Sequence, residues 1–289
     1  MRTLKILSFS IMVLPSVAVA DFVPQEFAAS FANSPPTIDG KLDDPAWTKA
    51  ELIDQFYVYQ SGGTPAASPG KMRILWDAMN LYVGMELSDT NILPSSVTKG
   101  IHGHDQALYE GDVIELFIRE SRSSPKYFEF EWSPTGDVFD ARFDQVRFGP
   151  PGTNFESGVV SAVSVNGTLD NTQDIDTGWT VEAKIPLSAF APIASGSSWD
   201  FTFARYDYSL RPPSGYRADL MMTTLGDPAA TNGGVTQGFH TYEIYDRLTF
   251  LPVPEPSALQ FLPLLLLWRG NAVLRLGQPW NFVGTHSTA

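Results

Sequence analysis

Two histidines and an aspartate stand almost side by side near residue 100. The segment His102-Gly-His104-Asp105 offers imidazole and carboxylate groups that can bind zinc or copper. Such a site needs a further strong ligand from elsewhere in the chain, and the sequence identifies none. A loop that contains glycine explains the segment equally well. A metal site and an ordinary loop therefore stay open as alternatives.

The sequence contains none of the common catalytic motifs. It has no G-x-S-x-G elbow and no H-E-x-x-H pair, and Pro69-Gly-Lys71 is followed by Met72 rather than by the Ser or Thr of a phosphate-binding loop. Because there is no cysteine, disulfides, thiolate metal sites and cysteine nucleophiles are excluded. Carboxylate pairs are unavoidable among 32 acidic residues, so a pair alone does not identify a glycosidase. We predict a protein without catalytic activity.

The charge of the chain restricts its partners. The formal net charge is −13. An acidic surface repels phosphate groups, so neither nucleic acid nor anionic lipid is an expected partner. Cations and neutral polar ligands fit this surface, and the ordinary solvated surface of an exported protein explains the charge as well.

Composition and periodicity predict an all-β fold. The chain has 23 glycines and 22 prolines, 12% aromatic residues and only 18% charged residues, which favours strands over helices. Apolar residues alternate with period two between turn residues from about residue 31 to residue 250. The predicted strands cover residues 71–77, 81–88, 112–119, 127–132, 178–186, 199–208 and 242–250. We predict a single antiparallel β-sandwich over residues 21–250.

This alternation also assigns polar residues to faces. Glu115 alternates with inward-facing apolar residues in the strand 112–119, and Glu129 does the same in the strand 127–132. In the strand 199–208, Arg205 shares a face with two phenylalanines.

The N-terminal segment has the pattern of a signal peptide. Arg2 and Lys5 form a basic region, Ile6 to Leu14 an apolar region, and Ala18-Val-Ala20 a cleavage site of small residues. We predict that residues 1–20 are removed and that the protein is exported.

The C-terminal segment resembles a sorting signal. Pro252-Val-Pro-Glu-Pro256 precedes the apolar stretch 257–268 and then Arg269, as in the PEP-CTERM signal of Gram-negative bacteria. The resemblance implies that residues 251–289 are a tail that an exosortase-type enzyme removes, so that the chain meets the membrane only transiently. Residues 270–289 extend beyond the family's pattern. The protein is then expected in the periplasm, at the cell surface or in an extracellular polysaccharide matrix.

Six blocks between the termini follow the order of a known family. Residues 36–47, PTIDGKLDDPAW, resemble the IDG-x-LD-x-x-x-W opening of carbohydrate-binding module family 9, and residues 109–117, YEGDVIELF, resemble its W-x-x-D-x-x-E-x-F block. The other matching blocks are residues 73–83, 127–136, 178–186 and 238–250. Together they cover nearly the whole domain.

This resemblance implies a β-sandwich of the DOMON-related group that holds a sugar between two aromatic rings, with polar side chains on its hydroxyl groups. Tyr109 stands where the family has one sandwiching tryptophan, and Glu115 matches the acidic residue six positions on. Glu129 and Arg205 lie on strands that supply polar contacts. The second sandwiching tryptophan is missing from residues 225–240, where Phe239 is the nearest aromatic ring.

The family also implies structural roles for other residues. One is calcium binding in loops near the sugar site. Aspartates do occur in the predicted turns, but Asp is favoured in turns whether or not it binds calcium. Four tryptophans match core positions: Trp47, Trp76, Trp132 and Trp179.

Three functions remain open. The first is an exported, non-catalytic carbohydrate-binding protein, and the second is a structural sandwich of the cell surface without affinity for sugar. The third comes from the wider DOMON group, in which a similar sandwich holds b-type haem through Met with His or Lys. The available residues would be Met72, Met85, Met221, Met222 and His240. Methionine on core strands ordinarily packs, which argues against the haem alternative.

Overall fold

The computed structural model describes residues 22–95, 105–145, 155–208, 219–225 and 238–253. The predicted signal peptide, His102, His104 and residues 254–289 lie outside these ranges. Within them, no helix has the length and apolar character needed to cross a membrane.

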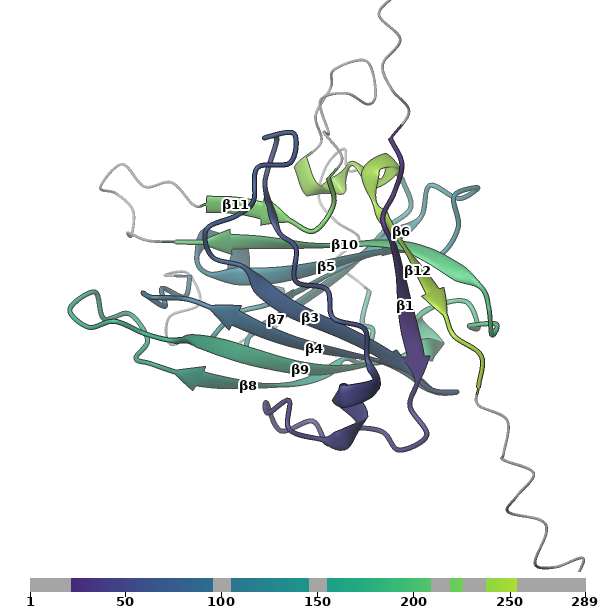
Figure 1. The fold of residues 1–289 in the computed structure, drawn as a ribbon, viewed down its shortest axis with the longest axis horizontal. Helices are drawn as coiled ribbons and strands as arrows, with labels where there is room; N and C mark the ends of the chain where they lie inside the picture. The colour runs from purple at the N-terminus through teal and green to yellow at the C-terminus, as the bar shows by residue number, and fades with distance from the viewer. Residues whose placement is uncertain (1–21, 96–104, 146–154, 209–218, 226–237, 254–289) are drawn as a thin grey trace, which may run out of the picture. The chain divides into compact units, whose positions relative to one another are not determined.

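The described part of the chain contains twelve strands, and its only helical segments are short 3-10 turns (Figure 1). The strands are β1 (Glu26–Phe31), β2 (Tyr57–Val58), β3 (Gly70–Trp76), β4 (Asn80–Ser88), β5 (Val113–Arg119), β6 (Tyr127–Trp132), β7 (Val138–Phe143), β8 (Val160–Asn166), β9 (Gly178–Pro186), β10 (Ser198–Asp207), β11 (Asp219–Met222) and β12 (Asp246–Phe250). The all-β prediction is confirmed.

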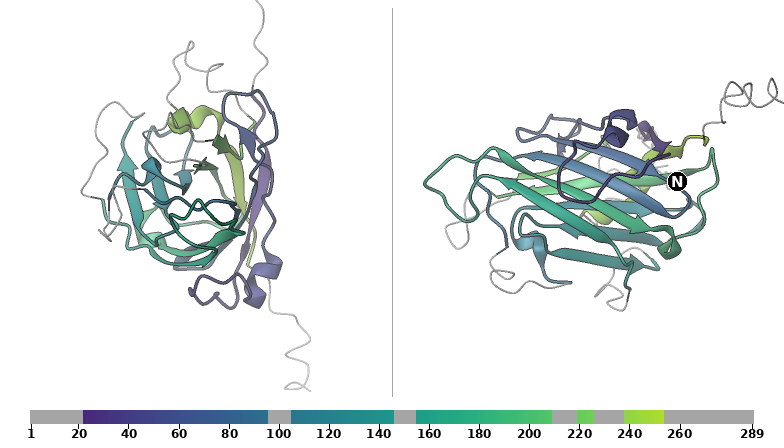
Figure 2. Two further views of the ribbon diagram at one scale, coloured as in Figure 1. Left: turned by 90° about the vertical axis from the view of Figure 1, so that its left-hand side faces the viewer. Right: turned by 90° about the horizontal axis from the view of Figure 1, so that it is seen from below.

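The strands pair in the order β7-β6-β5-β10-β12-β1-β3-β4-β9-β8, with β11 and β2 beyond β10. We call β7, β6, β5, β10, β12, β11 and β2 sheet A, and β3, β4, β9 and β8 sheet B. Strand β1 joins them, because its first four residues pair with β12 and its last two residues pair with β3. Both pairings are parallel, so the predicted sandwich is a curled mixed sheet rather than a purely antiparallel one (Figure 2).

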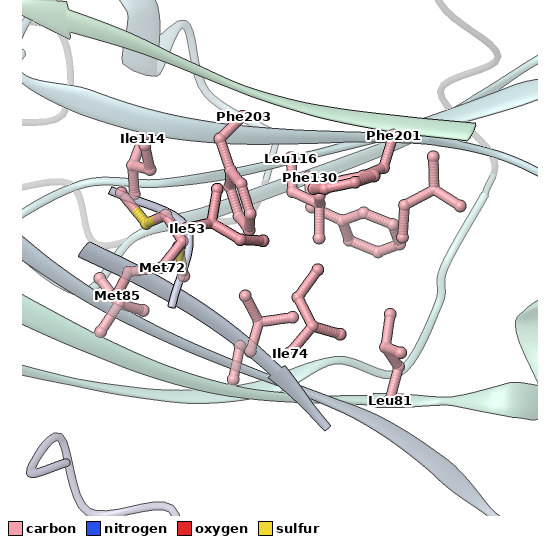
Figure 3. Close-up of a cluster of buried hydrophobic side chains, with 14 of the residues drawn as sticks. Ile53, Met72, Ile74, Leu81, Met85, Ile114, Leu116, Phe130, Phe201 and Phe203 are labelled. Carbon is pink, nitrogen blue, oxygen red and sulfur yellow. The ribbon is translucent and has the colours of Figure 1, made fainter. Parts of the chain in front are cut away.

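The main core lies between the two sheets. Figure 3 shows Ile114, Phe130 and Phe203 of sheet A pointing toward Met72 and Ile74 of sheet B. All five side chains are buried, as the period-two pattern predicts. Trp76, Trp132 and Trp179 belong to the same core, which confirms their predicted packing role.

Sheet A is also covered on its outward face. Two 3-10 turns, η6 (Gly238–His240) and η7 (Tyr242–Ile244), pack there against Phe117 of β5. The hydroxyl of Tyr245 donates to the Phe239 carbonyl at 2.7 Å and holds the turns in place. The strand predicted over residues 242–250 is therefore wrong in its first part, and β12 begins only at Asp246.

Sheet B is partly covered on its outward face by the 3-10 turn η1 (Pro45–Lys49). The buried Trp47 indole donates to Glu182 Oε1 at 2.7 Å, which confirms that Trp47 packs. Gly84 of β4 makes room for this ring, since a Cβ there would lie 2.6 Å from Leu42 and 3.1 Å from Trp47.

Candidate functional site

Three glutamates lie together on the outward face of sheet A. The register pairs Glu115 of β5 with Glu131 of β6 and Phe117 with Glu129, so all three carboxylates project from neighbouring positions. Oxygen atoms of the three lie within 4.8 Å of one another, and none of the side chains is more than 4% exposed. We call Glu115, Glu129 and Glu131 the glutamate cluster.

The glutamate cluster creates a strongly negative environment. Three carboxylates with oxygens within 4.8 Å of one another and little exposure to water concentrate negative charge on this face. Tyr206 of β10 lies on the same face, and burial followed by the charges of Glu115, Glu131 and Glu129 raises its pKa. Such a site favours ligands that bring hydrogen-bond donors or positive charge.

Aromatic rings border the cluster on one side. His240 Nδ1 lies 2.9 Å from the Tyr127 hydroxyl, and His240 Nε2 lies 3.9 Å from Glu129 Oε1. The His240 ring also makes edge contacts with Phe117 and Phe143. Turn η6 thus brings a polar aromatic group to the edge of the glutamate cluster.

Tyr109 lies in the 3-10 turn η2 (Leu108–Glu110), just before β5, and is 46% exposed. Its carbonyl accepts a hydrogen bond from the hydroxyl of Tyr208, which follows β10. Burial, followed by neighbouring acidic and phenolic groups that include Glu115, raises the pKa of Tyr208 to about 12. The predicted ring is therefore accessible, in the turn that leads into β5.

Arg205 does not join this group. It pairs with Ile114 of β5, so its side chain enters the interior between the sheets. There its guanidinium lies 3.2 Å from Asp89 and 3.6 Å from Asp207, and it is fully buried. Arg205 and Glu129 therefore lie on opposite faces of sheet A and do not come together at one site, because Arg205 is in register with the inward-facing Ile114 and Glu129 with the outward-facing Phe117.

Phe239 is not an open platform for a sugar. It is only 5% exposed and packs edge-on against Tyr59 and Tyr206, at centroid distances of 5.0 and 5.5 Å. Residues 226–237, which complete the segment where the family has its second tryptophan, lie outside the described residues. Tyr109 is thus the one predicted sandwiching ring that the described structure leaves accessible.

Sequence reasoning did not select three residues of the site. Glu131 carries a signal, because it is two positions from Glu129 and so shares its face. Tyr206 carries no such signal, because the predicted residue of its strand, Arg205, is its neighbour and points to the opposite face. For His240 the sequence offers no such signal, because only the fold of residues 238–245 over sheet A brings it beside Glu129.

A second cluster of carboxylates lies inside the domain, at one end of the core. We call Asp89, Asp112 and Asp207 the aspartate cluster; their oxygens also lie within 4.8 Å of one another. Either cluster could hold a metal ion by its carboxylate oxygens. The glutamate cluster fits a cation better, because in the aspartate cluster the Arg205 guanidinium already supplies positive charge.

The methionines considered for haem have other surroundings. Met72, Met85 and Met221 pack in the main core, and Met222 lies on the opposite face of sheet A. This arrangement agrees with ordinary packing of methionine.

Known proteins resemble the chain over most of its length. It is 27% identical over 217 residues to the exoglucanase XynX of Acetivibrio thermocellus and 25% identical over 205 residues to the endo-1,4-beta-xylanase A of Thermoanaerobacterium saccharolyticum. These matches cover 75% and 71% of the chain but only 17% and 15% of the two relatives.

Solved structures share the fold. A carbohydrate binding module family 9 from Caldicellulosiruptor kristjanssonii, in complex with cellotriose, superposes with a TM-score of 0.53 at 15% identity, covering 81% of this chain and 97% of that one. A carbohydrate binding module family 9 from the same organism, in complex with glucose, gives a TM-score of 0.54 at 15% identity, covering 81% of this chain and 100% of that one. Residues 38–223 match the family described as carbohydrate family 9 binding domain-like. Since this match covers more than half of the sequence, the chain belongs to the carbohydrate family 9 binding domain-like family.

Proposed function

We propose that the protein is a non-catalytic carbohydrate-binding module that holds a sugar over the outward face of sheet A. The observation that carries the proposal is the glutamate cluster, three carboxylates on one face of sheet A, together with the accessible Tyr109 in the turn just before β5. The cellotriose and glucose complexes of family 9 modules from Caldicellulosiruptor kristjanssonii support a ligand of this class.

The chemistry of this face suits a pyranose. Sugar hydroxyls would donate charge-assisted hydrogen bonds to Glu115, Glu129 or Glu131. The Tyr109 ring would pack against the apolar C–H face of the sugar. With one accessible ring, binding is expected to be weak, with a Kd near millimolar to tens of micromolar.

The direct test is calorimetric titration of the protein with glucose and with cellotriose. We expect saturable binding of at least one of them in this affinity range. If neither binds, the sugar-binding proposal fails and the structural alternative takes its place. The buried Phe239 favours that alternative, since it offers no second stacking surface.

We further propose that a calcium ion supports this face. Calcium prefers several carboxylate oxygens, which the glutamate cluster provides from three side chains. Adding EDTA should then lower the melting temperature, and restoring calcium, but not magnesium, should recover it. An unchanged melting temperature would remove calcium from the proposal.

Export and sorting are part of the same proposal. The basic, apolar and small-residue regions of residues 1–20 support cleavage before Asp21, and the Pro-Glu-Pro segment supports processing of the tail by an exosortase-type enzyme. We expect the mature protein at the surface or in the matrix of a Gram-negative cell. Intact-mass measurement on protein from its native host tests this, because retention of residues 257–289 would contradict the sorting signal.

A further inference from the structure

A concave region lies on sheet B and contains no residue of the glutamate cluster. Its volume is about 310 Å³, at the lower end of the range of about 300–1,000 Å³ found for small-molecule sites. It crosses four neighbouring strands and the residue before β9. The lining residues are Lys71, Glu86, Leu87, Ser88, Ser164, Asn166, Thr177, Gly178, Trp179 and Thr180. We call this region the sheet B groove.

The lining of the sheet B groove is rich in hydrogen-bonding groups. Ser88, Ser164, Thr177 and Thr180 contribute hydroxyls, and Asn166 contributes an amide. The exposed groups among them, on Ser88, Ser164, Asn166 and Thr177, match the hydroxyl rim of a sugar as donors or acceptors, whereas the Thr180 hydroxyl already donates to the Gly40 carbonyl at 2.6 Å.

A glycine keeps one part of the groove free of side chains. Gly178 pairs with Ser88 across β4 and β9. Its φ of +143° is rarely adopted by other residues, and a Cβ there would lie 2.0 Å from the Leu87 carbonyl oxygen. Backbone therefore forms the wall at this point.

The charges in the groove are unequal. Lys71 and Glu86 face each other across β3 and β4, yet the Glu86 carboxylate bonds Arg73 at 3.0 Å. Among the described residues, the exposed Lys71 ammonium has no acidic partner within 4.0 Å. The groove thus presents a free positive charge, although the chain as a whole has a net charge of −13.

We propose that the sheet B groove is a second glycan site, selective for a sugar unit that carries a carboxylate. The Lys71 ammonium would bond the carboxylate, and the hydroxyls and amide would bond the ring. Charge complementarity selects this ligand over a neutral sugar, because a neutral ring leaves Lys71 without a counter-ion. The glutamate cluster has the opposite preference, since its carboxylates repel an acidic sugar. The two sites would therefore divide glycans by charge.

Titration with sodium glucuronate and with glucose, followed by ligand-observed NMR, tests the proposal. We expect the protein to bind glucuronate, and Lys71→Gln to weaken this binding about tenfold or more through loss of a charge-assisted bond. Lys184→Gln is the matched control, because Lys184 lies on β9 outside the groove and should leave binding unchanged. Higher salt should weaken glucuronate binding selectively.

The same titrations on Glu115→Gln separate this proposal from the proposed function. That variant should retain glucuronate binding while losing glucose or cellotriose binding. Three results would overturn the second site: no glucuronate binding by the wild type, equal binding by Lys71→Gln, or loss of glucuronate binding in Glu115→Gln. Melting curves of each variant show that it is folded.

Discussion

The glutamate and aspartate clusters contain the same chemical groups in opposite settings. Both consist of three carboxylates whose oxygens lie within 4.8 Å of one another. The aspartate cluster faces the interior, where the Arg205 guanidinium pairs with Asp89 and Asp207. The glutamate cluster lies on the opposite face of sheet A, where His240 packs edge-on against Phe117. The difference follows from strand alternation, because Glu115 and Arg205 lie on neighbouring strands of sheet A but on opposite faces.

The aspartate cluster is satisfied by the fold itself. Asp112 accepts hydrogen bonds from the backbone N–H groups of Leu93 and Tyr208, and Asp89 accepts one from Asn91 at 3.0 Å. Arg205 also donates to the Ser68 carbonyl at 2.9 Å. Burial nevertheless raises the pKa of Asp112 well above its ordinary value. The comparison teaches that the same grouping of three carboxylates meets a cation and backbone donors inside the domain, and aromatic side chains on the opposite face of sheet A.

The largest expected effect is a loss of stability when the Arg205 guanidinium is removed from the aspartate cluster. Arg205→Met removes the guanidinium and leaves buried carboxylates without it, which should cost about 3–5 kcal/mol of unfolding free energy. Urea unfolding at pH 7 measures this cost. A loss below about 1 kcal/mol would show that Arg205 does not hold the aspartate cluster together.

Asp246 provides a buried carboxylate without a described cationic partner. Its oxygens accept bonds from Gln25 N at 2.9 Å and Gln25 Nε2 at 3.4 Å, and burial raises its pKa from 3.8 to about 7. A raised pKa means that the protonated form stabilises the fold. This contribution is fully present below about pH 4 and is lost as the pH rises through about 7, for a total on the order of 4 kcal/mol.

Asp246→Asn should therefore be close to the wild type in stability at pH 4 and clearly more stable at pH 8. Unfolding in urea at pH 4, 6 and 8 tests this prediction. A constant difference between the two proteins across these pH values would contradict the raised pKa. Asp200→Asn is a useful comparison, because Asp200 is buried but bonded to Arg122 at 2.9 Å.

Substitution of Glu115 in the glutamate cluster is expected to have an intermediate effect, on sugar binding. Glu115→Gln keeps the shape of the side chain but removes a charged acceptor, so sugar binding should weaken by about 1.5–3 kcal/mol, or roughly 10- to 150-fold. The melting temperature should hardly change, in contrast to Arg205→Met. Calorimetry with cellotriose measures the binding. A stable variant that binds like the wild type would place the sugar elsewhere.

The smallest expected effect concerns the accessible ring. Tyr109→Ala should weaken sugar binding by roughly 1 kcal/mol or more through lost stacking. Stability should not change, because the side chain is 46% exposed. Tyr109→Phe is the matched control and should retain binding, since stacking does not need the hydroxyl. Equal binding by the Ala and Phe variants would exclude a stacking role.

Seven of the twelve strands follow from sequence periodicity, and the others illustrate where it fails. Strand β8, VSAVSVN, is mostly exposed or half-buried, so it has no buried apolar stripe to mark it. Strand β1 is half-buried along most of its length, and its parallel partners β12 and β3 lie far away in sequence. Neither feature leaves a local pattern.

The sequence by itself determined the strand faces, the four core tryptophans and the outward positions of Glu115 and Glu129. These follow from period-two alternation, which is a property of the local chain. Tertiary structure alone decided which groups meet. Arg205 finds Asp89 at a separation of 116 residues, and His240 reaches Tyr127 at a separation of 113. Such contacts depend on strand order and on the fold of turns over a sheet, and neither is encoded within one strand.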